Sequence, residues 1–359
     1  MISFIDLKRQ YESIRNEIDE SIKKVLENGY FVLGKELESF EKNFASYCNK
    51  EYGIGVGNGT DAIFLALKAL GIGKEHEVIS VPNTAIPTIA AIVATGAKPV
   101  FVDIKEDYLI DEKKIERAIT KKTRAIIPVH LYGNSCEMDK ILEIAKKHNL
   151  AVIEDCCQAH GTEYKNKKVP IGNIGCFSFY PSKNLSCYGD GGMIITSSKE
   201  IADKLKLLRN YGQEDRYHAY INGYNSRLDE IQAAILNAKL KYLDKWNERR
   251  REIARKYDSG LKNIIKIPIE NKNIKHVYHL YVVRSKNRDK LIEHLKKKNI
   301  ASLIHYPIPL HLQKAYSYLG YKEGELPVAE TISKEIVSLP CYPELTDEEV
   351  GEVVGAVGN

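Results

Sequence analysis

The chain has 359 residues and a mass of 40.7 kDa, which predicts one large domain joined to a smaller one. With 43% hydrophobic and 28% charged residues, the composition excludes a disordered, collagen-like or disulfide-scaffold protein. The formal net charge is only +5, and the lysines are scattered or fall in short runs such as 296–298. This pattern is typical of solvated helix faces, so we expect no nucleic-acid partner.

Cysteine usage and the N-terminal segment indicate a compartment for the protein. The seven cysteines form no C-x-x-C pair, so we expect reduced thiols, no metal site and a cytoplasmic location. The first 13 residues carry charges where a signal peptide needs an apolar stretch. The longest weakly polar run, residues 85–97, is too short to cross a bilayer, so we also expect no membrane partner.

In chain order, apolar spacing first predicts helices over residues 12–26 and 35–47. Strand-like and helix-like segments then alternate up to residue 154. Because the predicted strands are short, apolar and rich in β-branched residues, we expect a mainly parallel sheet covered by helices. The predicted strands are residues 53–57, 78–81, 99–103, 124–129 and 151–154, and the predicted helices are residues 60–70, 86–95, 111–119 and 138–148.

The second half of the chain has a different pattern. Strands at 176–179 and 192–196 flank a glycine-rich loop, and a helix at 201–209 follows them. A long amphipathic helix is predicted over residues 228–257, and such helices often bridge two domains. Beyond it, a strand at 279–284, a helix at 286–298 and two closing helices predict a smaller α+β domain. We therefore expect a large α/β domain over residues 1–245 and a small domain over residues 246–359.

A glycine-rich turn at residues 55–62 permits more than one interpretation. Gly57, Gly59 and Ala62 match a G-x-G-x-x-A dinucleotide fingerprint, but no acidic residue lies near position 81, where that fingerprint needs one. Gly59 and Thr60 instead open a helix whose free N–H groups suit a phosphate. A plain turn with a helix cap is the structural alternative.

Two further segments carry candidate chemistry. A buried strand delivers Asp155 at its carboxyl end, where it could bind a metal, act as a base or pair with a protonated ring nitrogen, and Gln158 follows within reach. Lys183 lies in a Ser- and Gly-rich loop five residues after Ser178. A partly desolvated lysine forms a Schiff base readily, and a lysine with an aspartate aimed at a ring nitrogen is typical of a pyridoxal 5′-phosphate (PLP) site.

With these residues in place, the chain resembles the DegT/StrS-type nucleotide-sugar aminotransferases, which have the fold-type I PLP architecture. The resemblance extends over nearly the whole chain in the same order. It rests on FVLGKELESFE (31–41), VGNGTDAIFLALKALGIG (56–73), PVFVDI (99–104), PVHLYG (128–133), EDCCQAHG (154–161), FYPSKNL (179–185), GYNSRLDEIQAA (223–234) and HYPIPLHLQ (305–313).

The resemblance implies a role for each matching residue. Lys183 is expected to form the Schiff base and to move the proton, and Asp155 to pair with the pyridinium nitrogen. Gln158 is expected beside the ring hydroxyl, and Asn225 is expected to reach the phosphate from a second subunit, which implies a homodimer with shared active sites. Gly59, Thr60 and Ser178 match the phosphate cradle.

The resemblance also implies a substrate class. The amino donor is expected to be L-glutamate, released as 2-oxoglutarate, and the acceptor a nucleotide-linked keto sugar. The loops FYPSKNL…GDGG and GYNSR resemble members acting at C3 of dTDP-3-keto-6-deoxyhexoses, with UDP-linked 3-keto or 4-keto sugars as the alternative. Arg227, His218 and His311 fall in regions near the nucleotide-sugar entrance, although packing explains each histidine equally well.

Three other functions remain to be weighed. A PLP-dependent sugar dehydratase typically replaces the Schiff-base lysine with histidine, but Lys183 is present. A non-catalytic regulatory protein on this fold would have lost Lys183, Asp155 or Asn225, and all three remain. A nucleotide-dependent oxidoreductase would rest on the weak glycine fingerprint alone.

Overall fold

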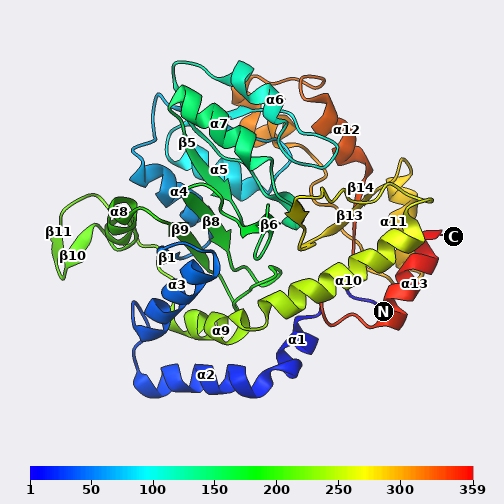
Figure 1. The fold of residues 1–359 in the computed structure, drawn as a ribbon, viewed down its shortest axis with the longest axis horizontal. Helices are drawn as coiled ribbons and strands as arrows, with labels where there is room; N and C mark the ends of the chain where they lie inside the picture. The colour runs from blue at the N-terminus through cyan, green and yellow to red at the C-terminus, as the bar shows by residue number, and fades with distance from the viewer. Residues whose placement is uncertain (359) are drawn as a thin grey trace.

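The centre of the molecule is a seven-stranded sheet, seen in a computed structural model that describes residues 1–358 (Figure 1). Strand β9 runs antiparallel to both of its neighbours, and the other contacts in the sheet are parallel. The predicted mainly parallel α/β sheet is therefore confirmed. In spatial order the strands are β1 (Tyr52–Val56), β9 (Gly192–Thr196), β8 (Ile174–Ser178), β5 (Ala151–Asp155), β4 (Thr123–Ile126), β2 (Glu77–Ser80) and β3 (Lys98–Phe101).

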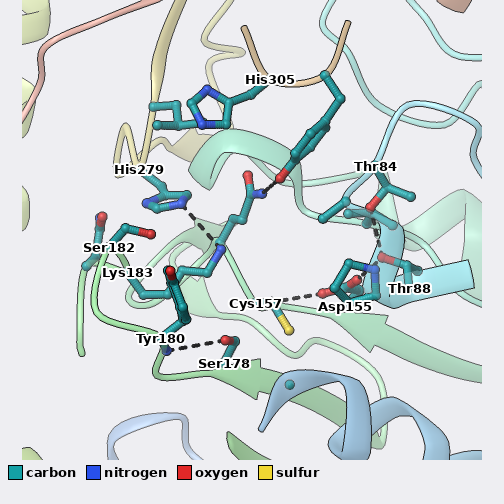
Figure 2. Close-up of a pocket in the computed structure, with 18 of the residues that line it drawn as sticks. Thr84, Thr88, Asp155, Cys157, Ser178, Tyr180, Ser182, Lys183, His279 and His305 are labelled. Carbon is teal, nitrogen blue, oxygen red and sulfur yellow. Dashed lines mark hydrogen bonds between the residues drawn. The ribbon is translucent and has the colours of Figure 1, made fainter. Parts of the chain in front are cut away.

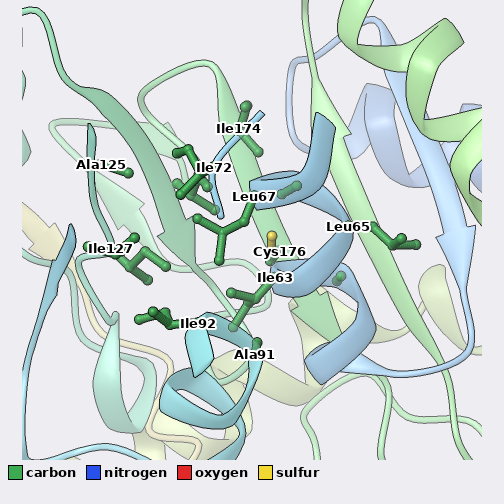
Figure 3. Close-up of a cluster of buried hydrophobic side chains, with 14 of the residues drawn as sticks. Ile63, Leu65, Leu67, Ile72, Ala91, Ile92, Ala125, Ile127, Ile174 and Cys176 are labelled. Carbon is green, nitrogen blue, oxygen red and sulfur yellow. The ribbon is translucent and has the colours of Figure 1, made fainter. Parts of the chain in front are cut away.

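Helices cover both faces of this sheet. Because successive side chains of a strand point to opposite faces, Cys176 and Phe177 of β8 enter two different hydrophobic clusters. Figure 3 shows the Cys176 cluster, in which Ile63 and Ile92 pack from two helices against the strands. The Cys176 face is covered by α4 (Gly59–Ala69), α5 (Ile86–Ala94) and α8 (Lys199–Arg209). Helices α3 (Lys35–Tyr47) and α9 (Glu230–Leu240) cover the Phe177 face, and α7 (Met138–His148) contacts β5.

Two predicted helices are each divided in the structure. The N-terminal segment forms α1 (Leu7–Ser13) and α2 (Arg15–Asn28), which meet at Ile14, a residue with the non-helical φ of −134°. The predicted helix over 228–257 forms α9 and α10 (Leu243–Leu261). Ile14 at the first break is itself buried, and Leu236 and Leu243 on either side of the second break are buried as well. Apolar spacing therefore continues across both breaks, and the pattern alone could not locate them.

Helix α10 leads from the sheet to the C-terminal elements, and both chain ends lie on that side (Figure 1). There Tyr257, Tyr281 and Val353 share a hydrophobic cluster with Ile2 from the N-terminus. The predicted strand and helices are present, and a further strand, β14, was not predicted. The elements are β13 (Tyr281–Arg284), which pairs with β14 (Ile336–Leu339), and α11 (Arg288–Lys297), α12 (Pro327–Glu335) and α13 (Asp347–Gly358). The domain boundary near residue 245 stays a prediction.

Smaller elements complete the fold. Among residues 1–358, no helix has the length and apolar character needed to cross a membrane. The predicted helix over 111–119 is a short α6 (Glu112–Ile115) followed by a 3-10 turn at Glu116–Ala118. Three small strands form a separate sheet, β6 (Glu163–Tyr164), β7 (Lys167–Lys168) and β12 (Ile274–Lys275), and β10 (Gln213–Asp215) and β11 (His218–Ala219) form a hairpin that projects from the body (Figure 1).

Candidate active site

A cavity of about 790 Å³ lies at the carboxyl ends of β5 and β8, beside the start of α4. Open α/β sheets bind ligands at this edge, because the loops that leave the strands converge there. The cavity is also lined from the C-terminal half of the chain, by residues such as Arg250, His279 and His305. Six of the residues predicted to hold the cofactor meet in it: Gly59, Thr60, Asp155, Gln158, Ser178 and Lys183.

The loop that carries Lys183 connects two adjacent strands, β8 and β9. Backbone hydrogen bonds fix both ends of the loop, since Phe179 N–H donates to Gly191 O at 2.8 Å and Cys187 N–H donates to Phe179 O at 2.9 Å. Within the loop, Lys183 N–H donates to Tyr180 O at 2.8 Å. The lysine therefore projects from a closed turn toward the cavity (Figure 2).

Lys183 has few partners that would favour its charged form. Its Nζ lies 3.5 Å from His279 Nε2, a contact drawn in Figure 2. Burial lowers the pKa of Lys183, although the electrostatic interactions with Cys157 and Asp155 act to raise it. Burial also lowers the pKa of His279 well below its usual value, and the neighbouring Lys183 adds to that shift. A neutral amine beside a neutral imidazole is the state these shifts favour, and a neutral amine is the nucleophilic form.

Asp155 is buried at the end of β5 and is held from both sides. Thr88 Oγ1 donates to one carboxylate oxygen at 2.8 Å, and Cys157 N–H donates to the other at 3.1 Å. The Thr88 hydroxyl in turn lies 2.9 Å from Thr84 Oγ1 (Figure 2). These contacts fix the orientation of the carboxylate and leave it on the cavity wall, as pairing with a ring nitrogen requires.

The start of α4 forms an anion-sized cradle. The Asn58 side chain accepts from Asp61 N–H at 2.9 Å and the Asn58 carbonyl accepts from Ala62 N–H, whereas the N–H groups of Gly59 and Thr60 have no partner among residues 1–358. A helix N-terminus with free N–H groups binds phosphate. A Cβ built at Gly59 would lie 2.7 Å from the Ser178 Cβ, so only glycine fits here.

Gln158 connects the floor of the cavity to the C-terminal half of the chain. Its Oε1 accepts from Tyr132 N–H at 2.8 Å, and its Nε2 donates to Tyr306 OH at 3.0 Å. The Tyr132 hydroxyl also donates to the carbonyl of His305. These hydrogen bonds fix Gln158 on the cavity wall. Its place beside the ring hydroxyl of a cofactor stays a prediction.

Four predicted site residues lie away from this cavity. Asn225 is exposed, bridges Asn210 through the backbone, and follows the β10–β11 hairpin. Arg227 donates to the Asn210 side chain at 3.1 Å, and His218 is exposed on the hairpin with Nδ1 2.7 Å from Asp215.

The fourth, His311, does not reach the cavity either. Its side chain is completely buried, Nε2 lies 3.0 Å from Glu330 Oε1, and its ring packs near Phe101 and Tyr321. Packing is the role that these contacts support, and the structure does not bring His311 together with the other candidates.

Several cavity residues escaped the sequence analysis. Thr88, which holds Asp155, lies in a segment predicted as a helix, and nothing in the sequence selected it as a site residue. His279 and Arg250 come from a strand-like segment and from a long helix, and neither lies in a motif. His305 was within a quoted motif, HYPIPLHLQ, but that motif gave no reason to select it. Only the fold shows that these segments meet.

These features fit PLP. The free N–H groups of Gly59 and Thr60 suit its phosphate, Asp155 suits its ring nitrogen, and Lys183 offers an amine in the same cavity. With a mainly parallel sheet and a cavity at its carboxyl edge, the fold and the site define a PLP-dependent enzyme of fold-type I.

Comparison with known proteins identifies the family. The profile of the DegT/DnrJ/EryC1/StrS aminotransferase family matches residues 12–358, and the chain belongs to that family. A dTDP-3-amino-3,6-dideoxy-alpha-D-galactopyranose transaminase of Aneurinibacillus thermoaerophilus is 50% identical over 99% of each chain. A dTDP-3-amino-3,4,6-trideoxy-alpha-D-glucose transaminase of Streptomyces venezuelae is 45% identical over 99% of this chain and 95% of its own.

The solved structures agree with this assignment. The crystal structure of DesV from S. venezuelae has a TM-score of 0.98 and 45% identity, covering 99% of this chain and 97% of its own. The predicted family, fold, cofactor and enzyme class are thereby confirmed: the protein is a PLP-dependent aminotransferase.

Proposed function

We propose that this aminotransferase moves an amino group from L-glutamate to C3 of a dTDP-linked 3-keto-6-deoxyhexose. The product would be a dTDP-3-amino-3,6-dideoxyhexose. The observation that carries the reaction type is the amine of Lys183 in one cavity with the anchored carboxylate of Asp155. The sugar class is supported by the two transaminases above, whose names specify dTDP-linked 3-amino sugars.

The side chains of the cavity have separate roles in the proposed reaction. Bound PLP supplies an electron sink for the charge left when a proton leaves the α-carbon of the donor. Lys183 Nζ, whose lowered pKa favours the neutral form, accepts that proton and later returns one. Asp155 keeps a proton on the ring nitrogen, and the N–H groups of Gly59 and Thr60 bind the phosphate.

The proposal includes a cytoplasmic homodimer in which Asn225 reaches the phosphate bound by the partner. Asn225 is exposed and does not line the cavity of its own chain. The adjoining hairpin exposes Tyr217 and Tyr220 by 80% and 61%, which is typical of a surface that another protein covers. Seven free thiols are typical of a reducing compartment.

The test is an absorption experiment on the purified protein loaded with PLP. A visible band that depends on Lys183 should appear, bleach when L-glutamate is added, and recover when a dTDP-3-keto-6-deoxyhexose follows. Mass spectrometry should then detect the amino sugar and 2-oxoglutarate. The same measurement with UDP-linked 3-keto and 4-keto sugars serves as the control.

Each outcome has a distinct meaning. Recovery with the dTDP-3-keto sugar alone supports the proposal in full. Recovery with a UDP-linked or 4-keto sugar instead contradicts the proposed acceptor but keeps the aminotransferase. A band that glutamate does not bleach contradicts the proposed donor.

A further inference from the structure

Arg250 is a buried cation on the wall of the active-site cavity. Its residue surface is 3% exposed, and its one side-chain hydrogen bond among the described residues joins Nη1 to Asn247 Oδ1 at 3.5 Å. No carboxylate of residues 1–358 lies within 4.0 Å of its guanidinium. A buried charge without a counterion is costly, so an uncompensated arginine in a cavity indicates that a ligand supplies the anion.

The groups around Arg250 do not supply that negative charge. Arg250 and Lys183 both disfavour the charged forms of His279 and His160, and both histidines have lowered pKa values. Glu344 is the carboxylate whose charge acts on Arg250, but it forms no ion pair with it, and burial raises the pKa of Glu344. This side of the cavity therefore has an excess of cationic and neutral polar groups.

The anion must come from one of the molecules that enter the cavity. The phosphate of PLP has its own cradle at Gly59 and Thr60. Among the described residues that line the cavity, Lys183 is the one lysine and Arg250 is the one arginine. Lys183 takes part in the reaction, so Arg250 is the cation that remains to bind an anion. The amino donor carries two carboxylates. One of them must be held in place so that the α-carbon of the donor faces Lys183.

We infer that Arg250 binds a carboxylate of the amino donor and of the 2-oxoacid it becomes. The inference rests on the proposed function, because it assigns the site of the donor in that reaction. The planar guanidinium fork matches a carboxylate with two parallel hydrogen bonds, which a lysine cannot reproduce. Leu339 and Tyr342 line the same cavity, and Cys341 between them contacts the Arg250 carbonyl, so the surroundings include apolar groups among which such a charge pair gains strength.

A small dicarboxylate suits this position better than the diphosphate of the sugar nucleotide. Arg250 is almost fully buried, whereas Tyr180, which also lines the cavity, is 55% exposed. A nucleotide is larger than the donor and must leave its base outside the reacting centre. Its phosphates are therefore expected nearer to exposed parts of the wall than to Arg250.

The experiment uses the PLP-loaded protein and glutarate, a dicarboxylate without an amino group that binds without reacting. Titration calorimetry measures its Kd for wild type, Arg250→Lys and Arg255→Lys. Arg255 lies on the same helix and is exposed, with Glu248 as its partner, so it is the matched control. We expect Arg250→Lys to raise the glutarate Kd about tenfold or more and Arg255→Lys to leave it unchanged.

A parallel titration with dTDP separates the two anion sources. Its Kd should be the same for wild type and Arg250→Lys, and the KM for glutamate should rise in that variant while the KM for the sugar nucleotide does not. Equal glutarate affinity in wild type and Arg250→Lys overturns the inference. A loss of dTDP affinity as large as the loss for glutarate also overturns it, because the anion would then be a nucleotide phosphate.

A crystal structure of the wild-type complex with PLP and glutarate keeps the inference testable if the variant does not fold. A carboxylate within hydrogen-bond distance of the Arg250 guanidinium supports it, and a carboxylate bound elsewhere contradicts it. The release of 2-oxoglutarate from glutamate by wild type is measured separately and decides the proposed function. The failure of one is therefore distinguishable from the failure of the other.

Discussion

Burial lowers the pKa of two lysines of this protein, Lys183, which is partly buried, and Lys239, which is fully buried, and they lie in regions of different character. Lys183 projects into a cavity beside His279 and shares that cavity with Asp155. Lys239, on α9, has no exposed surface, with Nζ 3.5 Å from Ser186 Oγ and 4.1 Å from the centre of the Tyr188 ring. Burial lowers the pKa of both, to about 8 for Lys239.

The comparison shows that a lowered amine pKa reports burial and does not by itself define a site. Lys239 has a packed environment in which its ammonium interacts with an aromatic face, and it does not line the cavity. Lys183 has open space in front of it and an anchored carboxylate across that space. What separates the reactive lysine from the structural one is the cavity and the carboxylate.

The largest expected effect is the loss of the cofactor band in Lys183→Ala. Without the amine, the variant should lack the Lys183-dependent visible band and all measurable turnover, while circular dichroism and the thermal midpoint stay close to wild type. Lys239→Met is the matched control and should keep the band. Turnover that persists in Lys183→Ala would contradict the assigned role.

Chemical labelling of the protein without PLP should separate the lysines next. An amine-acylating reagent at pH 8.5 should modify Lys183 about tenfold or more faster than Lys239, because Lys239 reacts only after local opening of the packed helices. Peptide mass spectrometry measures both rates in one sample. Equal rates would show that exposure to the cavity does not distinguish them.

A smaller effect is expected where the cavity depends on a second chain. Asn225→Ala should weaken PLP binding about tenfold, because a hydrogen bond to a charged phosphate is lost, while light scattering still detects a dimer. Asn222, exposed three residues earlier, is the control, and Asn222→Ala should bind PLP as wild type does. Unchanged PLP binding in Asn225→Ala would contradict the cross-subunit contact.

The last expected effect concerns stability around Lys239 and leaves the active site unchanged. Because its folded pKa of about 8 lies below the ordinary value of 10.5, the unfolded chain binds more protons between these pH values. The wild-type free energy of unfolding should therefore rise with pH in that window by at most about 1.4 kcal/mol per unit relative to Lys239→Met. Denaturant titrations of both proteins from pH 7 to 10.5 measure the difference, and parallel curves would contradict the shift.

The sequence was sufficient where one local pattern decides the structure. Helix α7, with apolar side chains on one face and polar ones on the other, has the predicted limits of Met138 and His148. The cofactor residues that line the cavity in this chain all lie in short motifs next to strand ends. The roles assigned to these residues stay predictions, because the structure shows where they lie and not what they bind.

Other parts of the fold depend on contacts between distant segments. β14 follows α12 without a turn signal, and the pairing of Ile336 with Arg284 of β13 is what makes this apolar run a strand. Arg250 is one of several arginines on a charged helix in the sequence. Only the packing of α10 against the cavity distinguishes it from Arg249 and Arg251, which form ion pairs.

The reversed direction of β9 has a consequence for how the enzyme acquires its cofactor. Because β8 and β9 are adjacent and antiparallel, backbone hydrogen bonds tie the segment between them to the sheet at both ends. The position of Lys183 is therefore set by the sheet and by the Asn184 side chain, which donates to Asn247 and to the Val277 carbonyl, and not by contacts with a bound cofactor. Loss and replacement of the cofactor therefore do not require this loop to refold.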